Sequence, residues 1–308
     1  MKKNQSRSNT IPTMATHFPS LSRADNIATN VHMFIEDIQL DIMPIGGRSR
    51  QKNFLVEFKG KKTECDKATE IIRELGKIKA YDNREIVCDA VNNIVRNLVW
   101  DGQAYYEIIK DKKQVYIKSF TSKNLYKLFG YYLQIIPKAD RTIWNRKFSF
   151  ANQSIVWEIV IPKSLGGVKK YQKLLKQMSR YDNLGPDFYR ENLNSGLIEK
   201  DFDFMKYRRN NKIYIDSATK NWGWNGRNWT QDRCTEFYTF YRMLNFKYAQ
   251  SLLREHVIDQ INCLFKRLSI KCKLKIKGLP TSKKILKIRK KMEIGELSFN
   301  DVSEKVQI

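Results

Sequence analysis

The chain has 308 residues, of which 42% are hydrophobic and 12% aromatic, so it is too apolar for a disordered protein and can build a sizeable core. Its 57 Lys and Arg residues exceed its 32 Asp and Glu residues by 25, which gives a formal net charge of +25. Such an excess repels itself unless a polyanion or an acidic partner is near, and nucleic acid is the first candidate.

Cysteine usage and the first residues bear on the compartment in which the protein is made. The cysteines are odd in number and form no C-x-x-C pair, so we expect neither disulfides nor a structural zinc site; they are Cys65, Cys88, Cys234, Cys263 and Cys272. The opening MKKNQSRSNTIPTMATHFPS has no apolar stretch of the kind found in signal peptides, and no apolar run approaches the length of a membrane span. We expect a protein that starts in a reducing cytoplasm and has no membrane partner.

The first part of the chain alternates between helical and strand-like patterns. Residues 1–20 are rich in Ser, Thr, Asn and Lys and contain two prolines, which predicts a flexible arm. Helical spacing of apolar residues predicts helices over 24–38, 68–75 and 87–98, and alternation predicts a strand over 53–59.

After Asp101 the pattern becomes that of β-structure. Residues 102–109 and 114–120 read as the two arms of a hairpin around a charged turn, and further strands are expected over 128–136 and 155–161. The Gly166-Gly167 pair lacks the G-x-x-x-x-G-K-[ST] frame of a phosphate loop. We therefore interpret it as the turn that opens a lysine-rich helix.

The last third of the chain holds the longest predicted helix. Residues 184–226 are expected to form a small β subregion, in which KIYIDS is a strand and NWGWNG is an irregular loop. The spacing of apolar residues over 230–268 predicts a long helix. We expect this helix either to be kinked or, if unbroken, to form a structural rod of about 57 Å. A strand (IKCKLKIKG), a capped basic helix (SKKILKIRKKMEI) and a short final helix follow.

Catalytic patterns are weak in this sequence. His17, His32 and His256 have no carboxylate or cysteine at ligand spacing, and the acidic residues are dispersed. Asp201 and Asp203 would share one face of a strand, which keeps a metal nuclease open as an alternative, but no further carboxylates can be assigned to it. We expect no enzymatic activity, no metal and no cofactor.

Charge placement is the clearest functional signal. Between residues 266 and 291, which we call the basic segment, the chain has twelve basic residues and no acidic one; these DNA-binding candidates are Lys266, Arg267, Lys271, Lys273, Lys275, Lys277, Lys283, Lys284, Lys287, Arg289, Lys290 and Lys291. In the predicted strand the lysines alternate with apolar residues and therefore share one face. Like charges so close destabilise one another unless phosphates or acidic groups lie opposite, which favours a DNA contact over a merely solvated face.

The aromatic loop that precedes the long helix contains Trp222, Trp224, Arg227 and Trp229. Trp and Arg are enriched at protein interfaces, so these four residues are candidates for a subunit interface. A base-stacking platform for single strands is the alternative.

The order of these segments resembles the portal proteins of tailed bacteriophages. VRNLVWDGQAYYEIIKDKKQVYIKSF resembles the helix, hydrophobic strand and charged turn of the portal wing, and the family's positions are filled by Leu98, Gly102, Ala104, Tyr105, Glu107 and Ile108. LREHVIDQINCLFKRLSIKCKLKI is similar to the portal helix that runs into a strand, and MEIGELSFNDV looks like the phrase that follows it. The resemblance extends over roughly two thirds of the chain, in order.

This resemblance implies a non-enzymatic α+β subunit of a twelve-membered ring at one vertex of a phage capsid, where double-stranded DNA is packaged and ejected. It implies a mixed wing of helices and β-hairpins, long stem helices and a small β clip. The implied partners are further copies of the chain, double-stranded DNA, the major capsid protein, a terminase and neck or adaptor proteins. The implied location is the virion, after assembly in the host cytoplasm.

Carried onto this chain, the resemblance gives four regions: a flexible arm (1–20), a wing-like α+β region (21–165), a stem helix with a clip-like region (166–229), and a long helix with the basic strand and C-terminal helices (230–308). The alternative function is a non-enzymatic basic nucleic-acid-binding protein of replication or recombination. A portal subunit predicts a large ring, whereas this alternative and a nuclease both predict small species.

Overall fold

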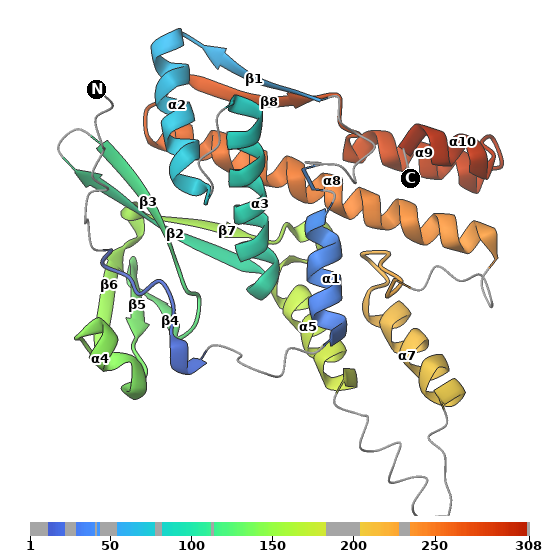
Figure 1. The fold of residues 1–308 in the computed structure, drawn as a ribbon, viewed down its shortest axis with the longest axis horizontal. Coiled ribbons are helices and arrows are strands. Elements are labelled where there is room, and N and C mark those ends of the chain that lie inside the picture. The colour runs from blue at the N-terminus through green and yellow to red at the C-terminus, as the bar shows by residue number, and fades with distance from the viewer. Residues whose placement is uncertain are drawn as a thin grey trace, which may run out of the picture. The chain divides into compact units, whose positions relative to one another are not determined.

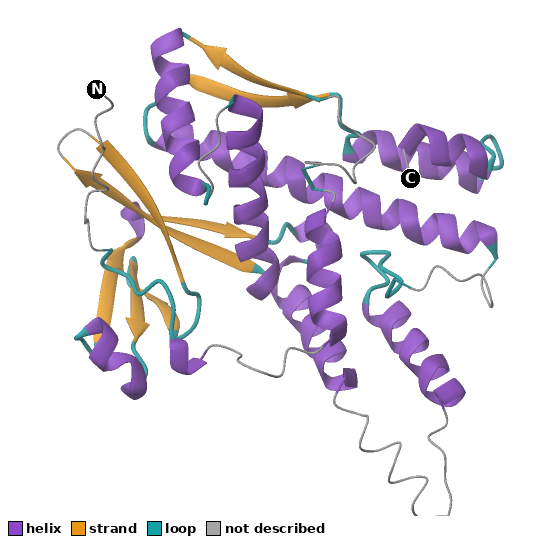
Figure 2. Cartoon of the chain, viewed as in Figure 1, coloured by secondary structure: helices purple, strands orange, loops and turns teal. Residues whose placement is uncertain are grey.

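The computed structural model describes residues 12–21, 29–40, 42–43, 54–77, 82–111, 114–182, 204–227 and 235–306. It confirms the α+β class (Figures 1 and 2). The chain divides into two compact units, each of which is formed by segments far apart in the sequence. Unit 1 comprises residues 1–22 and 104–158, and unit 2 comprises residues 23–103 and 159–308.

Unit 1 is built on two three-stranded sheets. In the first, with the order β3-β2-β7, the expected hairpin is confirmed: β2 (Gln103–Asp111) pairs antiparallel with β3 (Gln114–Phe120), and β7 (Val156–Val160) lies on the other side of β2. The second has the order β4-β5-β6 and consists of β4 (Leu125–Leu128), β5 (Tyr131–Ile135) and β6 (Phe148–Asn152), all antiparallel. Four short helical turns complete the unit: η1 (Pro19–Leu21), η2 (Lys138–Asp140), α4 (Arg141–Trp144) and η3 (Gln153–Ile155).

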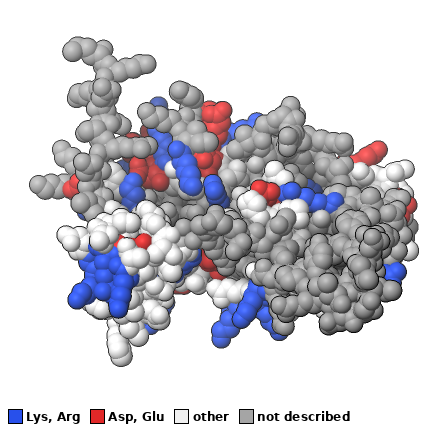
Figure 3. All heavy atoms as spheres, turned by 60° about the horizontal axis from the view of Figure 1, so that its bottom comes forward, with Lys and Arg blue, Asp and Glu red and all other residues white. Residues whose placement is uncertain are grey.

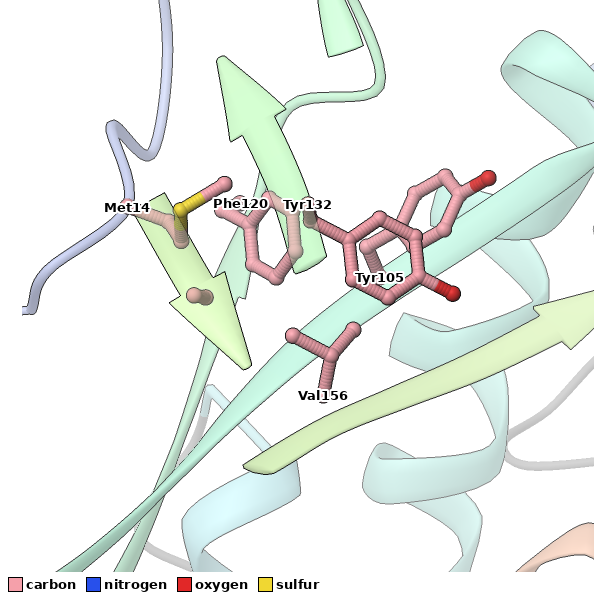
Figure 4. Packing of buried hydrophobic residues seen from close by; sticks show 6 residues of the cluster. Met14, Tyr105, Phe120, Tyr132 and Val156 are labelled. Atoms are coloured by element: carbon pink, nitrogen blue, oxygen red, sulfur yellow. The ribbon is translucent and has the colours of Figure 1, made fainter. Parts of the chain in front are cut away.

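The apolar core between these sheets includes part of the predicted arm. Met14 packs with aromatic and aliphatic side chains of both sheets, as Figure 4 shows; the cluster consists of Met14, Tyr105, Phe120, Tyr132, Ala151 and Val156. The backbone N–H of Met14 donates to Glu107 Oε2 (3.0 Å), and that of Ala15 donates to Gln134 Oε1 (2.7 Å). The prediction of a flexible arm is therefore wrong for residues 12–20, because two buried polar side chains need the hydrogen bonds that this segment provides.

Unit 2 is mainly helical. Its helices are α1 (Thr29–Leu40), α2 (Lys62–Leu75), α3 (Asn83–Asp101), η4 (Lys163–Leu165), α5 (Gly167–Asp182), α7 (Phe204–Ala218), α8 (Glu236–Arg267), α9 (Ser282–Glu293) and α10 (Phe299–Val306). A two-stranded antiparallel sheet pairs β1 (Leu55–Gly60) with β8 (Cys272–Lys277). Helix α8 contacts α3, α9 and β8, which come from both halves of the sequence. Among the described helices, none is both long and apolar enough for a membrane span.

Helix α3 illustrates why the periodic segments were predictable. Asp82 caps its first turn by accepting the backbone N–H of Glu85 (2.7 Å), and Gly102 ends it with a φ of 78°, a conformation that glycine adopts without strain. The predicted apolar stripe from Val87 to Leu98 is buried. Local signals and tertiary burial agree here, so the prediction is confirmed.

The expected β subregion is not found where the structure describes it. KIYIDS lies inside helix α7, and no strand occurs between residues 204 and 227. Ile215 is buried while Ile213 and Tyr214 are exposed, which is the one-sided burial of a helix. The β propensity of Ile and Tyr is a weak preference that packing overrides. The other residues of the expected β subregion, 184–203, lie outside the described residues.

Candidate nucleic-acid interface

Helix α8 is the scaffold of the basic segment. It runs continuously for 32 residues, or about 48 Å at 1.5 Å per residue, so the expected long helix is confirmed. Thr235 caps its first turn by accepting the N–H of Tyr238 (3.2 Å). At its other end Ser269 adopts a positive φ of 59°, and the N–H of Ile270 donates to the carbonyl of Phe265 (2.9 Å). This tight reversal sends the chain back along the helix it has just left.

The returning chain follows α8 from its C-terminal end towards its N-terminal end. β8 is held near the C-terminal end through Asn262, whose side chain bonds the backbone of Leu274. α9 then begins beside Glu255, which accepts hydrogen bonds from the N–H and hydroxyl of Ser282, and packs farther along against Leu244. The basic segment is therefore laid out in order along one helix.

The predicted alternation of β8 is confirmed. Cys272 and Leu274 are buried, whereas Lys273 and Lys277 are exposed and Lys275 is half-buried. The pairing with β1 places Lys59 directly opposite Lys273 and Glu57 directly opposite Lys275. Residues directly opposite one another lie on the same side of a sheet. We call this side, with Lys59, Lys273, Lys275, Lys277 and Glu57, the lysine face.

Glu57 offsets only part of the charge of the lysine face. Lys277 Nζ lies 2.6 Å from Glu57 Oε1, and this hydrogen bond is the main reason why the pKa of Glu57 lies below its usual value. The carboxylate is therefore ionised at neutral pH, and one negative charge stands against four lysines. Lys59 and Lys273 face each other as like charges, an arrangement that an external anion would stabilise.

Helix α9 has one apolar and one basic side. Ile285, Ile288 and Met292 join a cluster with Leu244 of α8 and with residues of α10. The lysines on the other side are exposed, apart from the half-buried Lys291, which is ion-paired with Glu296 (2.8 Å); they are Lys283, Lys284, Lys287, Lys290 and Lys291.

Arg289 does not belong to this exposed set. Its Nη1 donates to Asn245 Oδ1 of α8, its Nε lies 3.2 Å from Glu293 Oε1, and its guanidinium stands over the ring of Tyr241. These contacts join α9 to α8 and occupy part of the guanidinium, so Arg289 has a role inside the fold that the sequence did not reveal. A contact of Arg289 with DNA stays a prediction.

The remaining basic candidates flank the lysine face. Lys266 and Arg267 are exposed in the last turn of α8, where positive charge also suits the helix dipole. Lys271 precedes β8, and its backbone N–H donates to Glu64 Oε2 of α2 (2.9 Å). Glu64 also bonds Lys67 Nζ, so α2 contributes an acidic group at this end of the strand.

The aromatic loop is part of the core of unit 2. Trp222 is 1% exposed and Trp224 is 2% exposed, and both indoles make edge contacts with the ring of Phe34 of α1. Trp224 Nε1 donates to Asp37 Oδ2 (2.7 Å). Neither indole is open to a neighbouring subunit or to a base, so both sequence-based interpretations of these two residues are wrong.

Arg227, like Trp224, donates hydrogen bonds to side chains of helix α1. Its Nε donates to Asp37 Oδ1 (2.8 Å) and its Nη2 to Glu36 Oε2 (3.0 Å), and the first of these bonds is the main reason why its pKa lies above the usual value. Its predicted partner was another subunit, but the partners found are carboxylates of α1. Trp229 lies outside the described residues.

Two buried arginines of α8 were not singled out from the sequence. Arg242 reaches the carbonyl of Trp224, the hydroxyl of Thr219 (2.9 Å) and Asp216 Oδ1 (3.2 Å). Arg254 donates to the carbonyls of Ile42 and Pro280, and burial lowers its pKa to about 10. The signal in the sequence was an arginine within an apolar helical stripe, which marks a partner elsewhere in the fold.

Metal chemistry gains no support from the described part of the chain, where no three His, Cys, Asp or Glu side chains gather as they would around a metal ion. Asp201 and Asp203 lie outside the described residues. Comparison with models of known protein families gives no match, and comparison with curated proteins gives none either.

Proposed function

We propose that this protein is a subunit of the portal ring of a tailed bacteriophage, without catalytic activity of its own. The proposal combines the portal-like order of segments in the sequence with one observation in the structure. That observation is a continuous helix, α8, along which the basic segment folds back with its lysines directed outward. A rod that carries cations at several levels suits a subunit placed next to duplex DNA, because phosphates repeat along the duplex at short intervals.

In the proposed ring each protomer contacts the next through two different surfaces, as closed rotational symmetry requires. The proposed partners are double-stranded DNA, the major capsid protein, a terminase and neck or adaptor proteins, and the proposed location is the capsid vertex. The four regions expected from the sequence remain predictions, with residues 12–20 removed from the arm.

The size of the purified particle tests this proposal. Mass photometry and negative-stain microscopy should find rings of about twelve protomers, as the family resemblance implies. Particles no larger than a dimer would reject the portal function.

The second candidate is a non-enzymatic, basic nucleic-acid-binding protein of replication or recombination. It is favoured by the net charge of +25 and by the lysine face, neither of which requires a ring. A monomer or dimer that binds DNA with a strong salt dependence would support it.

A further inference from the structure

The sheet formed by β4, β5 and β6 has one face whose side chains are largely exposed. Its inner face carries Tyr132 and Ala151 of the core, together with Gln134 and Ser149, all buried. Strand alternation and the cross-strand register place seven apolar side chains on the other side, which we call the aromatic face: Tyr126, Leu128, Tyr131, Leu133, Ile135, Phe148 and Phe150.

Most of the aromatic face is open. Phe150 is 58% exposed, and Tyr126, Tyr131, Leu128 and Phe148 are exposed to a similar extent. Phe129, in the turn between β4 and β5, is 100% exposed. Soluble proteins seldom expose so many large apolar side chains on one sheet face unless something binds there.

The stretch of chain that forms this sheet carries a net positive charge. Between residues 121 and 157 the only acidic residue is Asp140, which is buried and accepts hydrogen bonds from Ser20. The same stretch contains six basic residues, Lys123, Lys127, Lys138, Arg141, Arg146 and Lys147. Lys138 and Lys147 are exposed; the register places Lys147 opposite Ile136, on the other side of the sheet from Phe148. In Figure 3, a patch of Lys and Arg atoms lies beside uncharged atoms on the side where Figure 1 places α4 and β4–β6, with a few Asp and Glu atoms next to them.

This combination restricts the partner. A contact in which two copies of this face meet would bring basic residues against basic residues, which costs free energy. An anionic partner is favoured, and four of the seven side chains on the face are aromatic and lie on all three strands. Unpaired nucleobases present flat apolar rings beside phosphates, so they complement both the rings and the cations. Paired bases in a duplex have their faces already stacked and cannot use such a surface.

We propose that the aromatic face binds single-stranded nucleic acid, with Tyr131, Phe148 and Phe150 stacking on bases and with the exposed Lys138 and the net positive charge of this stretch attracting the phosphates. The site is separate from the basic segment and depends on different residues. It does not depend on the portal function, because either proposed function is compatible with it.

Substitutions that remove only the aromatic rings test this site in the full-length protein. Binding of a fluorescent oligothymidylate is measured by anisotropy beside a labelled duplex of the same length. The double variant Phe148→Leu, Phe150→Leu keeps apolar side chains but removes the rings, and should weaken oligothymidylate binding at least about tenfold while leaving duplex binding unchanged. Phe148→Tyr, Phe150→Tyr should bind as the unmodified protein does. Ile213→Ala, on the exposed side of α7, controls for the loss of an exposed apolar side chain elsewhere.

A second measurement tests the role of the phosphates. Lys138→Gln should reduce the salt dependence of oligothymidylate binding by about 0.7 in the log–log slope if this lysine neutralises one phosphate. The proposal is overturned if the leucine double variant binds oligothymidylate as tightly as the tyrosine variant does. That result would assign the face to a protein partner, which needs apolar area but not aromatic rings. Because Lys138, Phe148 and Phe150 are all exposed, circular dichroism should show normal folding for every variant.

Discussion

The side-chain amide of Asn262 bonds both backbone groups of Leu274: Leu274 N–H donates to Asn262 Oδ1 (2.8 Å), and Asn262 Nδ2 donates to the Leu274 carbonyl (3.1 Å). The amide thus takes the place that a third strand would have beside β8. It fixes the strand of the lysine face to helix α8 and satisfies two polar groups of an edge that would otherwise need another partner.

Replacement of Asn262 should destabilise unit 2. Asn262→Ala leaves both backbone groups of Leu274 without this partner and should lower the free energy of unfolding by about 1–3 kcal/mol. Asn262→Asp keeps an acceptor for the N–H but sets a carboxylate against the carbonyl, so it should not restore stability. Urea denaturation measures both effects, with Asn300→Ala, at an exposed position of α10, as the control. Equal stability of Asn262→Ala and the control would contradict this role.

The lysine face should bind DNA without sequence preference. Lys273→Gln with Lys275→Gln should weaken duplex binding uniformly and flatten its salt dependence by about 0.9 for each phosphate that is no longer neutralised. Lys173→Gln with Lys176→Gln removes the same charge from the exposed side of α5 and should change the slope less. Anisotropy titrations over a range of salt concentrations measure the slope. If the two double variants behave alike, only net charge matters and the assignment of the lysine face fails.

Glu57 provides the opposite test of the same surface. Glu57→Gln removes the carboxylate that pairs with Lys277, so it should tighten duplex binding and steepen the salt dependence. Weaker binding by a folded Glu57→Gln variant would mean that the ion pair positions the lysines rather than offsetting their charge.

Trp224 should matter for folding and not for contacts between subunits. Its indole is buried against Phe34 and bonded to Asp37, so Trp224→Ala should lower the free energy of unfolding by about 3–5 kcal/mol. Leu40→Ala, at an exposed position of α1, should change it little. Thermal or urea unfolding at low protein concentration makes the comparison. A Trp224→Ala variant that is as stable as Leu40→Ala but fails to assemble would restore the interface prediction.

The cysteines should differ in their reactivity. Burial raises the pKa of Cys88 and of Cys272 to about 12, so both thiols stay protonated at pH 8, whereas Cys263 is exposed. Since the thiolate is the nucleophile, iodoacetamide should label Cys263 well before Cys88 and Cys272. Mass spectrometry of peptides from a time course measures the order. Denatured protein, in which the three should react alike, is the control, and early labelling of Cys88 in the native protein would contradict its burial.

The same pKa shift predicts a loss of stability at high pH. The pKa of the Cys88 thiol in the folded protein lies above its ordinary value of about 9. The thiol's contribution to the free energy of unfolding is therefore complete below pH 9 and is lost as the pH rises towards about 12. Cys88→Ala should reduce this dependence in unfolding measurements between those pH values. An unchanged dependence would assign it to other groups.

Periodic segments were predictable because local signals and burial point the same way in them. The helix with Val87 and Leu98, the hairpin after Gly102 and the long helix that ends near Arg267 were all found at about the expected residues. KIYIDS was missed because its intrinsic preference is small and helix α7 is set by one-sided packing around Ile215.

By itself the sequence determined the α+β class, the order of the main elements and the alternation that separates the lysines of β8 from Cys272 and Leu274. These features depend on residues a few positions apart along one strand or helix. Only the tertiary structure decided that Met14 is buried, that Trp224 faces Asp37, that Arg289 bonds Asn245 and that an aromatic face stays open on β4–β6. Each of these depends on whether segments far apart in the chain meet, and no local pattern records which side of an apolar strand or loop will find a partner.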